Sequence, residues 1–398
     1  MDSVIQNAFE RNFENDTENQ EEGPREAAEN LPRGADDGID HQKVEDEFDI
    51  DIDQAQIKVV GIGGAGNNTI TTLTDMGIEG AQTLALNTDA SHLGASKADK
   101  KMLIGRETTN GLGAGGKPKV GKKSAEESQR DIREELKDAD MVFITCGLGG
   151  GTGTGAAPVV AEMADNEGAI VLAAVTMPFK MEGTRIVKAE EGLKKLRQVT
   201  DTVIAIENQR LLDYAGDLPV KQAFAVADEL ISTMIKGISE TITQPSLVNL
   251  DYADVKTIMK DGGVASIGIG EADSSSRAEE ATEKAMNHPL LDMEYEGADG
   301  AIIQVIGGED LKLDEINEIG ESISKNLDPQ AQVIWGARVV PEYEGSMQVI
   351  AIITGVKSPY ILGPKSSKSG EDQTTSKTPE KQNKEGVTDE LGIQMLNK

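Results

Sequence analysis

The chain is poor in cysteine and in aromatic residues. Its 398 residues include one cysteine, Cys146, and only 3% are Phe, Trp or Tyr. A single cysteine excludes an intramolecular disulfide and argues against an oxidising compartment. Because Cys146 ends an apolar run, we interpret it as a buried packing residue rather than a nucleophile. The core must therefore be built mainly from aliphatic side chains.

The sequence also lacks long apolar runs and an excess of positive charge. No run approaches the roughly 18 apolar residues of a membrane span, and no signal peptide opens the chain. The net charge is −31. Such acidity argues against binding to nucleic acid and against direct adhesion to anionic lipid. We expect a soluble, cytoplasmic protein without direct membrane insertion.

Composition divides the chain into four parts. Residues 1–55 hold 18 acidic and 4 basic residues, with little apolar periodicity, and are predicted to be an acidic disordered arm. Two α/β domains are expected next, over residues 56–243 and 244–357. Residues 358–398 are predicted to be a flexible tail, and its apolar end at 389–396 is typical of a peptide that binds a partner.

Strand and helix patterns alternate along both predicted domains. This alternation predicts a Rossmann-like parallel sheet with helices on both faces, joined by a long central helix to a smaller α/β domain. The expected strands are 57–61, 83–87, 141–146, 170–176, 202–206, 265–270, 301–306, 333–340 and 348–354. The expected helices are 67–76, 122–137, 156–164, 185–198, 219–242, 252–260, 277–287 and 313–326.

Residues 149–155, with the sequence GGGTGTG, lie between a buried-strand pattern and a helix-forming stretch. Five glycines allow the backbone to approach an anion closely, and two threonines add hydroxyl donors where the helix begins. A flexible linker would instead be flanked by polar residues. We interpret this segment as a phosphate loop.

Two further glycine segments accompany it. Residues 61–66 match G-x-G-x-x-G after the first strand, with Asp89 about 20 residues on, which taken alone indicates NAD. A second, denser glycine loop favours a longer polyphosphate instead. Residues 111–118 are expected to close over a γ-phosphate. The Walker A likeness of residues 116–122 is rejected, because Lys123 replaces the magnesium-binding hydroxyl and no strand leads into it.

Phe224 and Asp228 are four residues apart and so share a helix face. The ring is suited to stacking on a purine, and the carboxylate can accept both N1–H and N2–H of guanine. Adenine does not offer this pair of donors. The alternative is that Phe224 is a core residue of an apolar helix.

The motifs GIGGAGNN, NTDA, GLGAGGKP, GGGTGTG and NLDYAD occur here in the order seen in FtsZ. The chain resembles FtsZ of the tubulin/FtsZ superfamily, archaeal type, over residues 56–356. The resemblance implies the tubulin/FtsZ fold, GTPase activity, GTP/GDP and Mg²⁺. It also implies that Glu182 and Arg185 contact the ribose and phosphates and that Asn208 contacts the guanine. Here Arg185 follows Glu182 by three residues instead of four, and Gln209 replaces the usual Asp.

The full predicted nucleotide site combines the glycine loops with these side chains. Its members are Gly63, Gly64, Ala65, Asn67, Asn87, Asp89, Gly113, Gly115, Gly149, Gly150, Gly151, Thr152, Gly153, Thr154, Gly155, Glu182, Arg185, Asn208, Phe224 and Asp228.

Asn249, Asp251 and Asp254 follow the long helix and are the predicted catalytic residues. An N-cap role explains one of the two acids and can explain both. From Phe224 to Thr243 the helix spans about 29 Å, so these acids cannot reach the nucleotide of their own subunit. They can reach that of a neighbour stacked head to tail, a contact that need not close and therefore makes a filament. The resemblance to FtsZ implies the same catalysis in trans.

Three classes of function remain open at this point. The first is a polymerising GTPase of a mid-cell division ring, whose tail, by resemblance, recruits a membrane adaptor such as SepF. The second is a GTP-binding regulatory or cell-shape paralogue with weak or no polymerisation. The third is an NAD-dependent oxidoreductase, against which the second glycine loop and the lack of an evident catalytic histidine count. A further FtsZ paralogue is a possible partner of the first class.

Overall fold

The computed structural model describes residues 55–356, apart from residues 217–218, 245, 249, 261, 288–294 and 296. The predicted arm, except for its last residue, and the tail over 358–398 lie outside the described residues. So does Asn249. The predictions made for these segments stay predictions.

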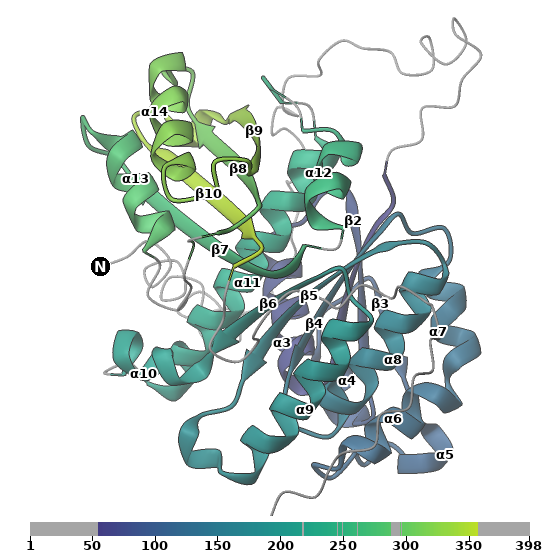
Figure 1. The fold of residues 1–398 in the computed structure, drawn as a ribbon. Helices are drawn as coiled ribbons and strands as arrows, with labels where there is room; N and C mark the ends of the chain where they lie inside the picture. The colour runs from purple at the N-terminus through teal and green to yellow at the C-terminus, as the bar shows by residue number, and fades with distance from the viewer. Residues whose placement is uncertain are drawn as a thin grey trace, which may run out of the picture. The chain divides into compact units, whose positions relative to one another are not determined.

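The described part of the chain contains strands and helices in alternation (Figure 1). Its strands are β1 (Ile57–Ile62), β2 (Ala81–Asn87), β3 (Lys100–Leu103), β4 (Met141–Gly147), β5 (Ile170–Met177), β6 (Thr202–Glu207), β7 (Gly263–Ala272), β8 (Gly300–Gly307), β9 (Gln332–Val339) and β10 (Met347–Thr354). Its α-helices are α3 (Gly63–Asp75), α4 (Ala90–Ala95), α5 (Arg106–Thr109), α6 (Pro118–Glu127), α7 (Gln129–Leu136), α8 (Thr152–Asn166), α9 (Thr184–Gln198), α10 (Asn208–Ala215), α11 (Val220–Thr243), α12 (Tyr252–Met259), α13 (Arg277–Met286) and α14 (Leu313–Ser324).

The strands form one ten-stranded sheet in the order β3-β2-β1-β4-β5-β6-β7-β10-β8-β9. The strands from β3 to β6 are all parallel. Strand β7 joins the two parts of the sheet: it pairs parallel to β6 through only two residue pairs and antiparallel to β10 through eight. The parallel-dominated α/β fold predicted from the sequence is therefore confirmed.

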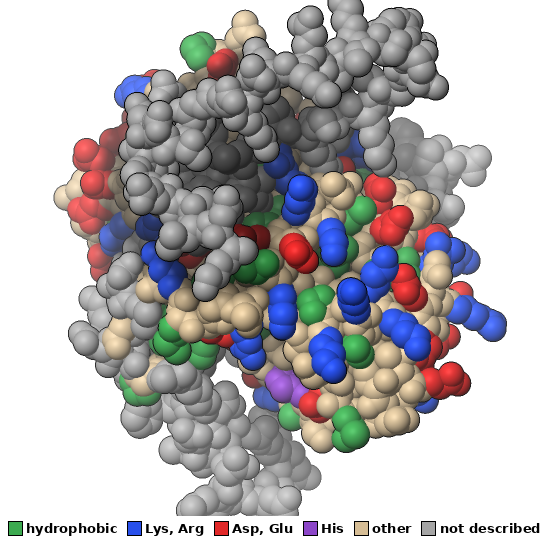
Figure 2. Space-filling model, turned by 60° about the horizontal axis from the view of Figure 1, so that its bottom comes forward, with side chains coloured by type: hydrophobic (Ala, Val, Ile, Leu, Met, Phe, Trp, Pro, Cys, Tyr) green, Lys and Arg blue, Asp and Glu red, His purple; other side chains and the backbone are tan. Residues whose placement is uncertain are grey.

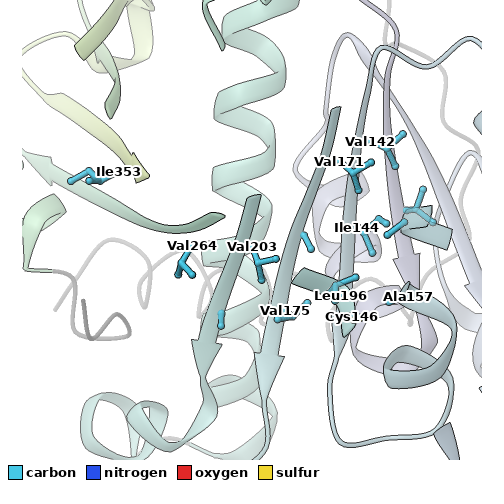
Figure 3. Packing of buried hydrophobic residues seen from close by; sticks show 14 of the residues in the cluster. Val142, Ile144, Cys146, Ala157, Val171, Val175, Leu196, Val203, Val264 and Ile353 are labelled. Atoms are coloured by element: carbon cyan, nitrogen blue, oxygen red, sulfur yellow. The ribbon is translucent and has the colours of Figure 1, made fainter. Parts of the chain in front are cut away.

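Aliphatic side chains form a core on each face of the sheet. Because successive strand residues point to opposite faces, Val60 and Ile62 enter one core while Val59 enters the other. Helices α6 to α9, α13 and α14 cover the first core, part of which is seen in Figure 3. Helices α3, α11 and α12 cover the second. Strands buried on both faces need continuous apolar runs, and β4 and β5 have them.

Cys146 lies in the first core beside Ile144 (Figure 3). Its side chain is 1% exposed, and burial raises the pKa of the thiol to about 12. A protonated, enclosed thiol is a poor nucleophile. The interpretation of Cys146 as a packing residue is confirmed.

Several element boundaries differ from those expected. Helices α3 and α8 begin at Gly63 and Thr152, four residues before the predicted starts, because the glycine loops themselves form the first turns. The single helix expected over 122–137 is two helices that meet at Ser128. Elements β3, α4, α5 and α10 were not predicted, since each is short or begins with polar residues.

Candidate functional site

The candidate site lies beside β1, where the chain stops adding strands on one side of the sheet and begins adding them on the other. Strand β1 sits between β2 and β4, so the loops that leave the carboxyl ends of β1 and β4 diverge to opposite faces of the sheet. Open α/β sheets bind ligands in the crevice at such a switch point. The three predicted glycine segments and the Asn87–Asp89 turn all meet at this edge.

The glycine run after β4 begins helix α8. Gly149 has a φ of 91°, a conformation that strongly favours glycine, and the helix starts at Thr152. The N–H groups of a first helical turn have no partner within the helix, and the helix dipole is positive there. Residues 149–155 therefore present an anion-binding helix end to the crevice.

The Gly111–Lys117 segment packs directly against this loop. A Cβ at Gly151 would lie 2.8 Å from Ala114 Cβ and 2.9 Å from the backbone nitrogen of Lys117. A Cβ at Gly155 would collide with the Pro118 carbonyl oxygen. The glycines are thus required for contact between two loops as well as for any ligand.

The turn after β2 holds these loops together. Thr88 Oγ1 is hydrogen-bonded to Thr152 Oγ1 at 2.7 Å, and the Gly113 N–H donates to the Thr88 carbonyl at 3.0 Å. Asp89 caps helix α4 by accepting the His92 N–H at 3.0 Å. The turn is therefore tied to both neighbouring glycine segments.

Asn67 is fully buried behind these loops. Its amide is placed to donate to the Gly61 carbonyl at 2.9 Å and to the Leu86 carbonyl at 3.2 Å, and to accept from Asn87 at 3.1 Å. These contacts join the ends of β1 and β2. In the structure Asn67 therefore positions the first glycine loop.

A cavity of about 640 Å³ opens between these loops and helices α10 and α11. Its volume is in the range of small-molecule sites. Ten of the predicted nucleotide-site residues line it: Gly64, Ala65, Gly150, Gly151, Thr152, Gly153, Glu182, Arg185, Asn208 and Phe224. Ten others are not among its lining residues: Gly63, Asn67, Asn87, Asp89, Gly113, Gly115, Gly149, Thr154, Gly155 and Asp228.

One end of the cavity is aromatic. The Phe224 ring is 41% exposed, and Phe179 contacts it edge to face with ring centroids 5.8 Å apart. Beside them the buried Oδ1 of Asn208 has no hydrogen-bond partner among the described residues. Since buried polar atoms are nearly always paired, this oxygen indicates a missing ligand donor. The interpretation of Phe224 as a simple core residue does not fit this exposure.

Asp228 lies one turn after Phe224 on α11. Thr69 Oγ1 donates to its carboxylate at 2.7 Å. Although the residue as a whole is partly exposed, burial of the carboxyl raises its pKa to about 7, with nearby Glu229 adding to the rise. With a pKa of about 7, this carboxyl group is only partly ionised near neutral pH. N–H donors that bind it would stabilise its ionised form.

Glu182 and Arg185 form an ion pair next to Phe179, whose N–H donates to Glu182 Oε1 at 3.0 Å. Arg185 Nη1 donates to Glu182 Oε2 at 2.5 Å, and both side chains line the cavity. The spacing of three residues therefore still brings the two together. Gln209 accepts the Lys180 N–H at 3.1 Å and so links α10 to the segment before α9.

Sequence reasoning missed Phe179, Met181 and Leu211, which also line the cavity. Phe179 and Met181 lie between β5 and α9, and Met181 is 88% exposed. The signal for them was their place after the carboxyl end of a parallel strand, where open α/β sheets bind ligands. Leu211 carries no such signal, because α10 was not predicted.

The two predicted catalytic acids lie far from this cavity. Asp251 is the N-cap of α12, and its Oδ1 accepts the Asp254 N–H at 2.8 Å. Tyr252 Oη donates to the Asp140 carbonyl at 2.8 Å, which anchors α12 at the amino end of β4. The cavity touches Gly147 at the carboxyl end of that strand. Figure 1 shows α10 near one end of α11 and α12 near the other.

A line of polar contacts follows α11 between these two places. Ser232 Oγ donates to the Thr69 carbonyl at 3.2 Å, and Lys236 Nζ donates to the Met76 carbonyl at 3.0 Å. Further along, Glu240 pairs with Lys236 at 3.5 Å and with Arg338 of β9 at 2.6 Å. Helix α11 is thus fixed both to the nucleotide-side helix α3 and to the second part of the sheet.

The described residues lack two features, a metal-binding cluster and a membrane-spanning helix. They contain no cluster of three or more His, Cys, Asp or Glu side chains placed to hold a metal ion. No helix in the described part of the chain has the length and apolar character needed to cross a membrane.

Comparison with known proteins agrees with this geometry. The model of the Tubulin/FtsZ family GTPase domain matches residues 56–216, and that of the FtsZ family C-terminal domain matches residues 263–357. The chain is 56% identical to "Cell division protein FtsZ 2" of Methanocaldococcus jannaschii, over 78% of this chain and 82% of that protein. It is 50% identical to "Cell division protein FtsZ 2" of Halobacterium salinarum, over 85% and 86% of the two chains.

A solved structure described as "FtsZ dimer, empty (M. jannaschii)" has the same fold. The TM-score is 0.74 at 52% sequence identity, and the match covers 79% of this chain and 92% of that one. The chain therefore belongs to the tubulin/FtsZ family and carries that family's GTPase domain followed by the FtsZ C-terminal domain.

Proposed function

We propose that this chain is a GTP-dependent polymerising cell-division protein that hydrolyses GTP between head-to-tail subunits. One observation carries the proposal: the cavity lies at the carboxyl end of β4, whereas α12 is anchored at its amino end. A seven-residue strand is about 23 Å long, so the acids of α12 are distant from the cavity of their own chain. Only a second subunit can bring both halves together.

The residues of the cavity fit a guanine nucleotide. The first-turn N–H groups of α8 would hold the phosphates, with Thr152 Oγ1 as a further donor. Phe224 would stack on the base, and Asp228 and Asn208 would meet its polar edge. Asn208 Oδ1, unpaired and buried, can accept a donor that guanine supplies.

Mg²⁺ fits this site only as a partner of the phosphates. The described residues include no protein cage for it, and Mg²⁺ commonly binds through phosphate oxygens and water. When bound it would neutralise phosphate charge. The chain's own part in that neutralisation is the N–H groups of residues 150–153 and the guanidinium of Arg185.

For hydrolysis, Asp254 of one subunit would orient a water molecule toward the γ-phosphate held by the next subunit. A bond forms between the water oxygen and the γ-phosphorus, and the bond from that phosphorus to the β–γ bridging oxygen breaks. The carboxylate of Asp254 accepts a proton from the water. Asp251, whose carboxylate caps α12, would hold Asp254 in position, and Asn249 would assist.

A head-to-tail contact uses two different surfaces of each subunit, so it extends into a filament instead of closing. Such filaments would lie at the mid-cell division site. The tail over 358–398 would link them to the membrane through an adaptor such as SepF, and an FtsZ paralogue could assemble with them. A regulatory or cell-shape paralogue that binds GTP without polymerising is the alternative function.

Sedimentation and phosphate release across a range of protein concentrations test the proposal. With GTP, pelleted protein and turnover should both appear above one shared critical concentration. Below it, turnover per subunit should fall toward zero, since no subunit has a complete site. Turnover per subunit that stays constant at every concentration would contradict catalysis between subunits.

The raised pKa of Asp228 gives a second prediction. Guanine N–H donors bind the ionised carboxylate, so GTP affinity should fall as the pH drops through about 7. Between pH 8 and pH 6 the loss should approach about tenfold, following the ionised fraction. Fluorescent-nucleotide titration measures it. Asp228→Asn should bind GTP more weakly with little dependence on pH, and an unchanged pH profile in this variant would count against the assignment.

A further inference from the structure

A strip of lysines begins beside the cavity. Residues 111–123 contain four lysines and no acidic residue. Lys119, Lys122 and Lys123 lie in exposed positions on α6, and none of them lines the cavity. Figure 2 shows Lys and Arg side chains gathered over this face of an otherwise acidic protein. Binding of the nucleotide therefore does not account for these charges.

Helix α9 extends the same surface. Lys188 Nζ donates to the Gly116 carbonyl at 2.9 Å, which places α9 against the Gly111–Lys117 segment. We call Lys117, Lys119, Lys122, Lys123 and Lys188 the basic rim. Lys122 pairs loosely with Glu126 at 3.6 Å, while Lys117 and Lys119 form no ion pair with any described residue. Much of the positive charge of the rim is thus uncompensated.

The rim also carries exposed apolar side chains. Leu112, in the glycine segment, is 84% exposed, and Val187, next to Lys188 on α9, is 59% exposed. The segment and the helix that carry the lysines therefore each also expose an apolar side chain. The surface fits a ligand that is acidic and apolar at once.

The chain contains such a segment. Residues 36–53 include nine acidic residues and one lysine. At the end of this segment Phe48, Ile50 and Ile52 alternate with acidic residues. A chain with this pattern can place carboxylates on lysines and apolar side chains between them.

The segment enters the fold within reach of the rim. The segment directly precedes β1. Lys58, at the start of β1, donates from Nζ to the carbonyl of Lys137, which lies at the end of α7, at 3.0 Å. The start of β1 therefore lies beside the end of α7. From there α7 and α6 lead back to Lys119 over 18 residues, or about 27 Å of helix. The 13 residues from Val44 to Ile57 can span about 44 Å when extended.

We propose that the acidic segment 36–53 folds back onto the basic rim of its own subunit. Opposite charges at short range provide the attraction, and the short tether gives a high effective concentration. This docking involves a single subunit and does not depend on assembly. The consequence rests on the proposed function: the rim lies beside the cavity, where the next subunit would dock, so the segment competes with assembly.

Disulfide trapping in the full-length monomer tests the docking. Asp46→Cys is combined with Lys119→Cys, and Cys146, buried with its pKa raised to about 12, stays unreactive. The control combines Asp46→Cys with Lys325→Cys, at the exposed end of α14. At high dilution without nucleotide, the rim pair should cross-link at least about fivefold faster at about 0.05 M salt, and this advantage should shrink at about 0.5 M. Equal rates for the two pairs overturn the proposal.

Neutralising the segment tests the competition. Changing its nine acidic residues to Asn or Gln in the full-length chain should lower the critical concentration several-fold at low salt. Residues 1–35 also hold nine acidic residues, so neutralising those instead is a control with the same change of charge. An unchanged or raised critical concentration would contradict the proposal that the segment competes with assembly. If no variant polymerises at all, the proposed function fails, while the disulfide rates still decide whether the segment docks.

Discussion

Asp254→Ala is expected to bind GTP and polymerise normally while losing at least about 100-fold in turnover. The size of the loss follows from the removal of a group that positions water and accepts a proton, which typically contributes about 100- to 10,000-fold. Asp254 is preferred over Asp251 for this test because Asp251 caps α12 through the Asp254 N–H. Loss of an N-cap costs about 0.5–2 kcal/mol and would confuse stability with chemistry.

Asp251→Asn separates the capping role of Asp251 from its charge. Asparagine caps helices about as well as aspartate, so this variant keeps α12 while removing one charge. Phosphate release measured above the critical concentration reports on turnover, and sedimentation of the same samples reports on assembly. Normal turnover in Asp254→Ala would remove this residue from the mechanism, and failure of the variant to sediment would instead show a role for it in assembly.

Gly151→Ala is expected to weaken GTP binding by about 5- to 150-fold. The new methyl group would lie 2.8 Å from Ala114 Cβ and 2.9 Å from the Lys117 backbone nitrogen. Overpacking of this kind costs about 1–3 kcal/mol, and each 1.4 kcal/mol corresponds to a factor of ten in affinity. Because the clash separates the two loops that flank the phosphates, the cost should fall on nucleotide binding.

Gly320→Ala provides the comparison for this variant. A Cβ at Gly320 of α14 meets no atom within 4 Å, so the same change there should leave binding intact. Thermal unfolding with and without GTP separates the two effects. Gly151→Ala should lose most of the stabilisation that GTP gives, whereas Gly320→Ala should retain it. Equal stabilisation by GTP in both variants would contradict the packing argument.

The sheet could be predicted from the sequence because buried parallel strands require unbroken apolar runs. The run at 141–146 became β4, and 170–176 became most of β5. The helix starts could not be predicted in the same way. Glycine is a poor helix former, so propensity places the first turns of α3 and α8 after the glycines, whereas tertiary contacts draw Gly63 and Thr152 into the helices.

The candidate site was predictable where a residue acts through its own chemistry. Phe224 and the loop around Thr152 line the cavity, and they were predicted because an aromatic ring and a glycine-rich turn before a helix each suggest a ligand contact by themselves. Phe179 and Leu211 were missed because their place depends on how separate elements meet in space. Asn67 shows the converse: its motif indicated a ligand, but its amide joins the ends of β1 and β2 behind the cavity.

In the proposed mechanism each catalytic site is built from two subunits. Asp254→Ala carries an intact cavity, and Gly151→Ala carries an intact α12. Mixing the two places the sound half of each variant in the same filament. The decisive measurement is phosphate release as the mixing ratio varies at constant total protein.

If sites are shared, turnover should rise above the sum of the two separate variants and reach a maximum near equal amounts. At that ratio about one quarter of the contacts would join two sound halves, if subunits assemble at random. Turnover that equals the weighted sum of the separate variants at every ratio, in samples that sediment together, would contradict the claim.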